Sequence, residues 1–381
     1  MIYLDYAATA PLRPQVAERL QTLITQPLGN PSSLHSAGKK ARMLLEQARE
    51  SCAESLGAKV EEILFCSGAT EADNLAILGP LTHGDCPIDC LISSALEHAA
   101  VFATIKRQEQ LGRKVLWLDV SLEGLLCPKD LEAKLQKQAN SLVSIMAVNN
   151  EVGVRQQIEK LSAVCRQHKA LLHVDAVQDV KTAKQLIEGG HVDLLALSGH
   201  KLGGLHGGLL YVRQGVPINP QTLGGSQEDG RRAGTSEVLR ADSMALALKL
   251  ALKDPKENAL QHREILESEL KSIPGAIRLG PDENEQRAEH ISSWLFPELL
   301  AEPVLVGLDI AGVCASSGSA CSSRSVSPSR VVRAMGYTDE QANGLVRFSF
   351  GWQSEIEETR RGAGIAREVV FRMMNKEKKQ R

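Results

Sequence analysis

The sequence lacks membrane-length apolar runs, cysteine pairs at CxxC spacing and any basic block before residues 376–381. Its apolar stretches, such as residues 141–148, are far shorter than the roughly 20 residues that span a bilayer. The first ten residues, MIYLDYAATA, lack the basic-then-apolar pattern of a secretory signal. We therefore expect a soluble cytoplasmic protein that does not contact a membrane.

Strong charge of either sign is also missing. The 381 residues carry 44 Lys+Arg and 46 Asp+Glu, for a formal net charge of −2. Because phosphate contacts require a basic face, we expect no direct nucleic-acid partner. The eight scattered cysteines are typical of reduced thiols. His83, Cys86, Cys90 and His98 have ligand-like spacing, but Cys90 opens an apolar run, so we expect no metal site.

Short apolar runs alternate with helical patterns through the first two-thirds of the chain. The runs predicted as strands are 62–66, 90–93, 114–120, 142–148, 171–175, 192–197 and 208–212. This alternation predicts an α/β fold, with a mostly parallel sheet covered by helices. Since ligands of such sheets bind beyond the carboxyl ends of the strands, we look for chemistry there.

The pattern changes near Pro255, where long helical stretches give way to mixed short strands and helices. We predict a large domain over residues 16–255 and a smaller α+β domain made of residues 1–15 and 256–381. The smaller domain contains a Ser- and Gly-rich stretch, 315–329, which we expect to be an exposed loop. Cys321 lies in this loop, the accessible setting that a reactive thiol needs, whereas Cys314 follows an apolar stretch and is expected to pack.

Polar residues follow several of the predicted strands. Lys201, in Ser198-Gly199-His200-Lys201, can form an imine if burial and neighbouring charge lower its pKa, although a lone lysine in such a turn is more often a surface residue. Asp175 either caps the following helix or keeps a ring nitrogen protonated. His98 either begins a helix or lies against another ring and moves protons.

Three further positions complete this pattern. Gln178 and Asn150 also follow strands, and Gly68 precedes a helix that begins at Ala69-Thr70. Backbone N–H groups and a hydroxyl at a helix start make a phosphate site, although Ser or Thr followed by Glu is common at helix starts. Together the positions indicate a site for a phosphorylated aromatic aldehyde that is held as an imine.

Ten ordered blocks make the chain similar to a known family. They are LDYAATAP (4–11), GNPSSLHSAG (29–38), SGATEADNLAI (67–77), LEHAAV (96–101), VNNEVG (148–153), HVDAVQ (173–178), SGHK (198–201), RRAGTSE (231–237), SSGSACSS (316–323) and VRFSFG (346–351). In these blocks the chain resembles the cysteine desulfurases, which are fold-type I pyridoxal-phosphate enzymes of the class V aminotransferase-like group. The long Ser-rich loop matches the group with an extended loop.

The resemblance implies an enzyme that removes sulfur from L-cysteine, leaving L-alanine and a persulfide on Cys321. An acceptor protein would take the sulfur for iron–sulfur cluster assembly or for thiolation of RNA or cofactors. The cofactor would be pyridoxal 5'-phosphate, with Lys201 as its Schiff-base lysine and Asp175 as the partner of its ring nitrogen. Gln178 would pair with the ring hydroxyl, and His98 would stack on the ring and take part in catalysis.

The resemblance also implies residues for the phosphate and the substrate. The phosphate would be held by Ala69, Thr70, Ser198, His200 and, from a second subunit of a homodimer, Thr235. Asn150 and Arg347 would orient the substrate, because a guanidinium offers a carboxylate two parallel hydrogen bonds.

Departures from the family pattern keep other functions open. Gly203-Gly204-Leu205-His206 differs from the sequence that many relatives have after the lysine, and predicts a looser turn. Tyr6 and Ala233 also differ from the commoner Asn and Ser. The alternatives are another enzyme of this fold, such as a small-amino-acid aminotransferase or a selenocysteine lyase, and a sulfur-delivery subunit that is inactive without its partner. A nicotinamide dehydrogenase is excluded, because no G-x-G-x-x-G follows a strand.

Overall fold

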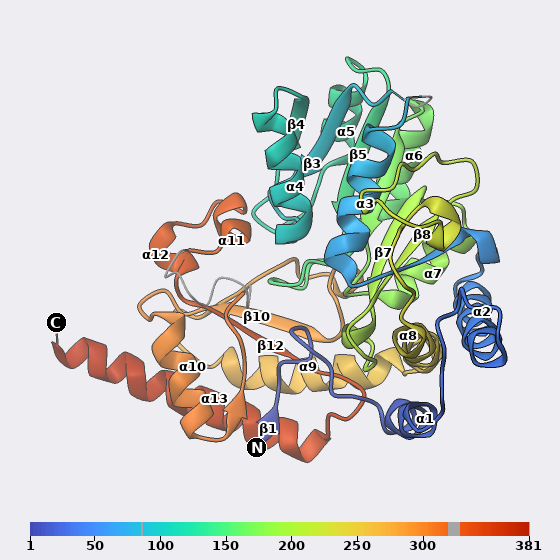
Figure 1. Ribbon diagram of the computed structural model, residues 1–381. Helices are drawn as coiled ribbons and strands as arrows, with labels where there is room; N and C mark the ends of the chain where they lie inside the picture. Colours follow the sequence, from blue (N-terminus) through green and yellow to red (C-terminus); the bar gives the residue numbers. More distant parts are fainter. Residues whose placement is uncertain (85–86, 319–327, 381) are drawn as a thin grey trace.

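A seven-stranded sheet forms the centre of the protein (Figure 1). The computed structural model describes residues 1–84, 87–318 and 328–380. The strands are β2 (Ile63–Cys66), β3 (Cys90–Ser94), β4 (Lys114–Leu118), β5 (Ser141–Met146), β6 (Leu171–Asp175), β7 (Leu194–Ser198) and β8 (Gly208–Val212), in the order β2-β8-β7-β6-β5-β3-β4. In this sheet β8 is antiparallel to both of its neighbours, β2 and β7, and the other neighbouring strands are parallel to one another. The predicted α/β fold with a mostly parallel sheet is therefore confirmed.

The strand order creates a crevice at one edge of this sheet. Strands β3 and β5 are adjacent and parallel, but the chain continues from β3 to β4 on one side and from β5 to β6 on the other. A reversal of strand order of this kind leaves room for a ligand beyond the carboxyl ends of the strands.

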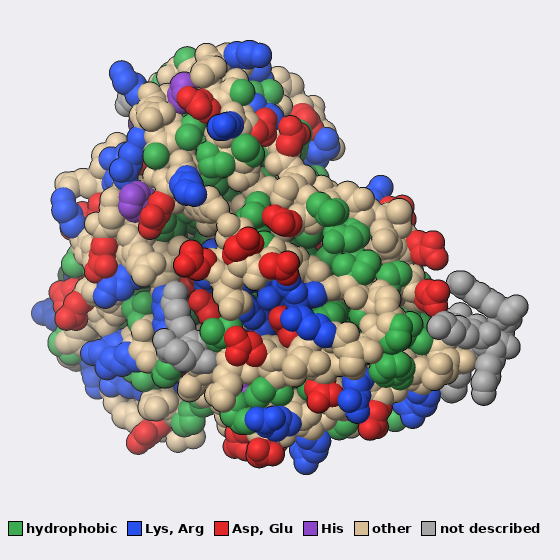
Figure 2. Space-filling view, turned by 180° about the vertical axis from the view of Figure 1, so that it is seen from behind, with side chains coloured by type: hydrophobic (Ala, Val, Ile, Leu, Met, Phe, Trp, Pro, Cys, Tyr) green, Lys and Arg blue, Asp and Glu red, His purple; other side chains and the backbone are tan. Residues whose placement is uncertain are grey.

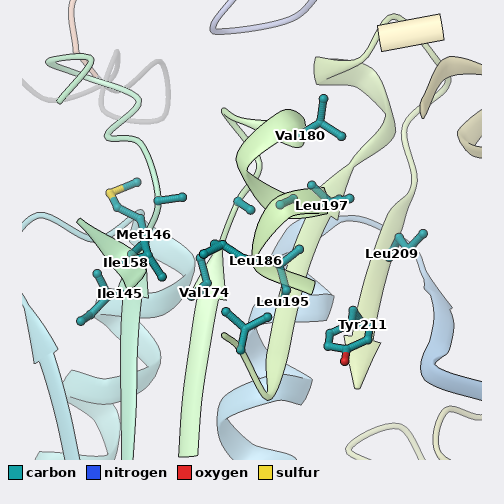
Figure 3. Packing of buried hydrophobic residues seen from close by; sticks show 14 of the residues in the cluster. Ile145, Met146, Ile158, Val174, Val180, Leu186, Leu195, Leu197, Leu209 and Tyr211 are labelled. Carbon is teal, nitrogen blue, oxygen red and sulfur yellow. The ribbon is translucent and has the colours of Figure 1, made fainter. Parts of the chain in front are cut away.

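Helices cover both faces of the sheet. On one face lie α3 (Ala69–Leu81) and α4 (Ala99–Gln110), and on the other α2 (Ser36–Leu56), α5 (Pro128–Leu135), α6 (Ile158–Gln167), α7 (Val180–Glu188) and α8 (Val238–Ala251). α1 (Pro14–Ile24) packs against α8. Successive strand residues alternate between the faces: Leu194 packs with α3 and α4, whereas Leu195 packs with Leu186 of α7 (Figure 3). Because both faces are buried, the strands read as continuous apolar runs.

A second core lies beside the large sheet (Figure 1). Its elements are the antiparallel strands β9 (Ile277–Arg278), β10 (Ile291–Leu295) and β12 (Leu345–Ser349), the parallel pair β1 (Ile2–Tyr3) and β11 (Val313–Cys314), and the helices α9 (Lys256–Leu270), α10 (Ala301–Ile310) and α13 (Ile356–Gln380). Trp294, Phe348 and Phe350 are buried at its centre. On the basis of this separate cluster we propose the division into residues 16–255 and residues 1–15 with 256–381.

Two short helices, α11 (Arg330–Ala334) and α12 (Asp339–Ala342), precede β12. None of the helices in the described ranges is both long and apolar enough to cross a membrane. On the face seen in Figure 2, acidic and basic side chains are interspersed, as expected from the nearly balanced charge.

Candidate active site

A cavity of about 330 Å³ lies beyond the carboxyl ends of β5, β6 and β7. The predicted site residues that line it are Ala69, Thr70, His98, Asn150, Asp175, Gln178, Ser198, His200, Lys201 and Arg347. Thr235 is exposed and does not line the cavity, and Cys321 lies outside the described residues. The structure thus brings together residues from six separate blocks of sequence.

Lys201 ends a short 3-10 turn, Gly199–Lys201, directly after β7. Its Nζ atom donates to the carbonyl oxygens of Ala7 at 2.6 Å and Ala8 at 2.5 Å. Both acceptors belong to the segment before α1, so the amine is held where the beginning of the chain crosses the sheet edge. The amine is therefore positioned by main-chain atoms rather than extended into solvent.

The turn after Lys201 is firmly hydrogen-bonded. The Gly199 carbonyl accepts from the Gly204 N–H at 2.9 Å, and the Leu205 N–H donates to Ser243 Oγ at 2.8 Å. Gly203 has a φ of +81°, which a side chain would strain. The glycines thus allow a compact turn that α8 anchors, and a turn looser than that of the relatives stays a prediction.

Asp175 is the last residue of β6 and is buried. Its Oδ1 accepts the Val177 N–H at 3.0 Å, so it closes the turn after the strand. The alternative that Asp175 caps the following helix is wrong, because the N-cap residue of α7 is Asp179. Burial, followed by the charge that Asp73 carries when it is ionised, raises the pKa of this carboxyl to about 6, while His98 opposes the shift. A cation bound beside Asp175 would favour the ionised form.

His98 is the N-cap residue of α4 and also lines the cavity. Its Nδ1 accepts the Ala100 N–H at 3.2 Å, so the proton of the neutral ring is on Nε2. Burial is the main cause that lowers the pKa of His98, and the charge of Lys201 lowers it further. The ring is therefore neutral near pH 7, which suits stacking on another ring and proton transfer.

The amino terminus of α3 forms one wall of the cavity. Gly68 is the N-cap residue and has no side chain to accept from the first helical N–H groups, Ala69 and Thr70 included. Opposite this helix start lie Ser198 and His200. Burial, followed by the charge of Lys201, lowers the pKa of His200 to about 4. Donors of this kind at a helix start suit a phosphate group.

Gln178 and Arg347 connect the cavity to the smaller core. The Gln178 side chain donates to the Ala7 carbonyl oxygen at 3.0 Å. Arg347, on β12, is buried and donates to the carbonyl oxygens of Asn150 at 2.7 Å and Gly318 at 3.0 Å, and to Asp5 at 2.9 Å. The guanidinium is thus held rigidly at the cavity wall, where it can bind a carboxylate.

The profile of the family described as Aminotransferase class-V matches residues 2–361. A cysteine desulfurase IscS from Dictyoglomus turgidum is 36% identical over 377 residues, which cover 98% of this chain and 95% of the relative. A putative cysteine desulfurase IscS 1 from Bacillus subtilis is 37% identical, covering 98% and 99%. The chain belongs to the cysteine desulfurases of the class-V aminotransferase family.

Solved structures agree with this membership. A NifS-like protein superposes with a TM-score of 0.87 at 30% identity, covering 97% of this chain and 99% of that protein. A structure titled "SspA in complex with cysteine" superposes with a TM-score of 0.77 at 30% identity, covering 92% and 99%. The predicted relationship to the cysteine desulfurases is confirmed.

The chemistry of the cavity fits pyridoxal phosphate, the cofactor that membership of this desulfurase family implies. A lysine amine can bind an aldehyde, a buried carboxylate can pair with a ring nitrogen, and a helix start can hold a phosphate. These three groups are Lys201, Asp175 and the amino terminus of α3, and all of them line one cavity.

Sequence reasoning missed several cavity residues, among them Ala7, Ala8, Asp73 and His206. Asp73 stands inside the block SGATEADNLAI, one helical turn after Thr70, so helical spacing could have found it. The alanines act through their carbonyl oxygens, for which a sequence gives no signal.

Proposed function

We propose that this cysteine desulfurase uses the cavity as its active site, with pyridoxal phosphate as cofactor and L-cysteine as substrate. The observation that carries the proposal is the convergence of Lys201, Asp175, the α3 amino terminus and Arg347 on one cavity of about 330 Å³. When bound, the cofactor supplies an electron sink for the bonding pair released at the substrate Cα.

The proposed cofactor contacts follow from the groups at the cavity wall. Lys201 would hold the aldehyde carbon, Asp175 the ring nitrogen, and Gln178 the ring hydroxyl, while His98 would lie against the ring. Ala69, Thr70, Ser198 and His200 would hold the phosphate. Thr235, which is exposed in this chain, would complete the phosphate site from the second subunit of a homodimer.

The side chains of this protein then perform three tasks. Arg347 and Asn150 bind the substrate carboxylate and orient its Cα. The amine of Lys201 takes the Cα proton, and Lys201 or Nε2 of His98 returns a proton. The thiolate of Cys321 attacks the substrate sulfur, so the carbon–sulfur bond breaks as the sulfur–sulfur bond forms. Alanine leaves, and Cys321 keeps the sulfur as a persulfide for an acceptor protein.

The decisive experiment is an absorbance spectrum of the purified protein before and after addition of L-cysteine and a reductant, with alanine and sulfide assayed in the same tube. We expect a yellow protein that yields both products. A yellow protein that gives no sulfide but transaminates pyruvate would indicate an aminotransferase. Sulfide that appears only when a second protein is added would indicate a partner-dependent subunit. A colourless protein that pyridoxal phosphate cannot reconstitute would overturn the site assignment.

A further inference from the structure

Asp73 is a second carboxyl group at the cavity, besides Asp175. It lies on α3 and is 1% exposed. Among the described residues, neither of its carboxyl oxygens has a hydrogen-bond partner. Buried carboxylates are normally paired with a cation or hydrogen-bonded. Because Asp73 has no hydrogen-bond partner, burial disfavours its charged form.

The nearest basic group to Asp73 is the ring of His173, two residues before Asp175 on β6. Its Nε2 lies 3.5 Å from Asp73 Oδ1, while its Nδ1 lies 2.8 Å from Ser144 Oγ. His173 is completely buried, and burial lowers its pKa to about 4. The ring is therefore neutral near pH 7 and supplies no positive charge to balance an ionised Asp73.

None of the other titratable groups around Asp73 forms a hydrogen bond with it among the described residues. They are Cys66 at the end of β2, Glu97 and His98 between β3 and α4, Asp175 on β6, and His200, Lys201 and His206 across the cavity. Glu97 and Asp175 are themselves carboxylic acids, and the amine of Lys201 donates to the carbonyl oxygens of Ala7 and Ala8 rather than to Asp73. Burial without a partner raises the pKa of Asp73 to about 8.

We propose that Asp73 is a positioning residue that acts as an uncharged acid, so that Asp175 carries the only negative charge at the floor of the cavity. Two nearby carboxyl groups do not both ionise easily, because each raises the pKa of the other. An ionised Asp73 would push Asp175 toward its protonated form and weaken it as the partner of a ring nitrogen. The inference rests on the proposed cofactor site.

Infrared spectroscopy of the purified holoprotein tests the protonation of Asp73 directly. At pH 7 we expect a carbonyl stretch from a protonated carboxyl that is present in the wild type and in Asp175→Asn, and absent from Asp73→Asn. The band that is missing from Asp73→Asn should disappear from the wild-type spectrum as the pH rises through about 8. Glu97→Gln is the control that identifies any similar band from the neighbouring buried acid.

The pH titration of the cofactor absorbance is the second readout. An amide is an uncharged isostere of a protonated carboxyl, so Asp73→Asn should move the midpoint by less than about 0.3 pH units and leave the Kd for pyridoxal phosphate within about twofold. A midpoint lowered by a full unit, or a spectrum without a band that depends on Asp73, would show that Asp73 is ionised and overturn the inference. Failure of the wild type to bind the cofactor would instead overturn the proposed function.

Discussion

His98 shows how one side chain can cap a helix and also line the cavity. Nδ1 accepts a backbone N–H at the start of α4, and this hydrogen bond fixes the proton on Nε2. Asp175 likewise closes a turn, and Arg347 binds main-chain oxygens of two loops. Substitution of these residues therefore changes the local structure and the chemistry together, so variants of Lys201 and Cys321 give clearer tests.

We expect Lys201→Ala to abolish covalent attachment of pyridoxal phosphate, because no other amine lines the cavity among the described residues. Borohydride reduction followed by mass spectrometry of the peptides measures the attachment. Lys181→Ala is the matched control, since Lys181 lines a neighbouring cavity and donates to the Asp254 carbonyl oxygen. Attachment that persists in Lys201→Ala would show that another amine is used.

We expect Cys321→Ala to bind the cofactor and respond to L-cysteine spectroscopically, but to lose sulfur transfer by about 1,000-fold or more, as nucleophile removal does in other enzymes. Labelling of the persulfide and assay of alanine measure the loss. Cys314→Ala is the control, because Cys314 lies on β11 and burial raises the pKa of its thiol. Normal alanine release by Cys321→Ala would remove this cysteine from the mechanism.

At the scale of elements, the strands were the most predictable part of the molecule. The predicted strands 171–175 and 208–212 coincide with β6 and β8, because both faces of the sheet are buried and the apolar runs mark the strand lengths. The pairing of β1 with β11 was not predicted, since two-residue strands have no periodic signal and their partners are distant in sequence.

The side chains that line the cavity could be predicted in part from the sequence. Residues that follow strands, such as Asp175 and Lys201, could be assigned to one edge because parallel strands end there. Contacts made through main-chain atoms, such as those of Lys201 with Ala7, depend on how the beginning of the chain crosses the sheet. Hydrophobic periodicity carries no information about that crossing.

The close approach of β8 to the start of α3 gives a prediction about an element. A Cβ atom at Gly208 would collide with the Gly68 carbonyl oxygen, whereas one at Gly207 would meet Arg240 Cβ at 3.6 Å, an ordinary contact. We expect Gly208→Ala to displace the α3 amino terminus, to lower stability by about 1–3 kcal/mol and to weaken cofactor binding. Thermal unfolding and the Kd for pyridoxal phosphate measure both effects. Gly207→Ala is the matched control and should resemble the wild type.

At the scale of the whole molecule, the cavity is closed by two cores that are distant in sequence. The large sheet supplies Lys201 and Asp175, and β12 of the second core supplies Arg347. Arg155 adds a bridge between the cores through ion pairs with Asp179 and Glu289. The shape of the cavity therefore depends on both cores being folded and in place.

Burial of neutral histidine makes the stability of the whole molecule depend on pH. His173 has a pKa of about 4 in the folded protein and about 6.5 when unfolded, so the unfolded state binds more protons between these values. The contribution of neutral His173 to the free energy of unfolding is complete above pH 6.5 and is lost as the pH falls toward 4. Between pH 7 and pH 5, we expect the free energy of unfolding to fall by about 2 kcal/mol less in His173→Gln than in the wild type.

Urea unfolding at both pH values measures this difference. His168→Gln, at the carboxyl end of α6, is the control for the substitution. Equal pH dependence in the wild type and in His173→Gln would show that His173 is not neutral in the folded protein.

The ion pair between Arg347 and Asp5 joins residues that lie 342 positions apart in the sequence. During synthesis on a ribosome, Asp5 therefore emerges long before its partner. The large sheet can form while the chain is still growing, but the cavity cannot close before β12 has emerged. A shortened chain that stops before β12 would therefore lack both Arg347 at the cavity wall and the buried residues that β12 gives to the second core.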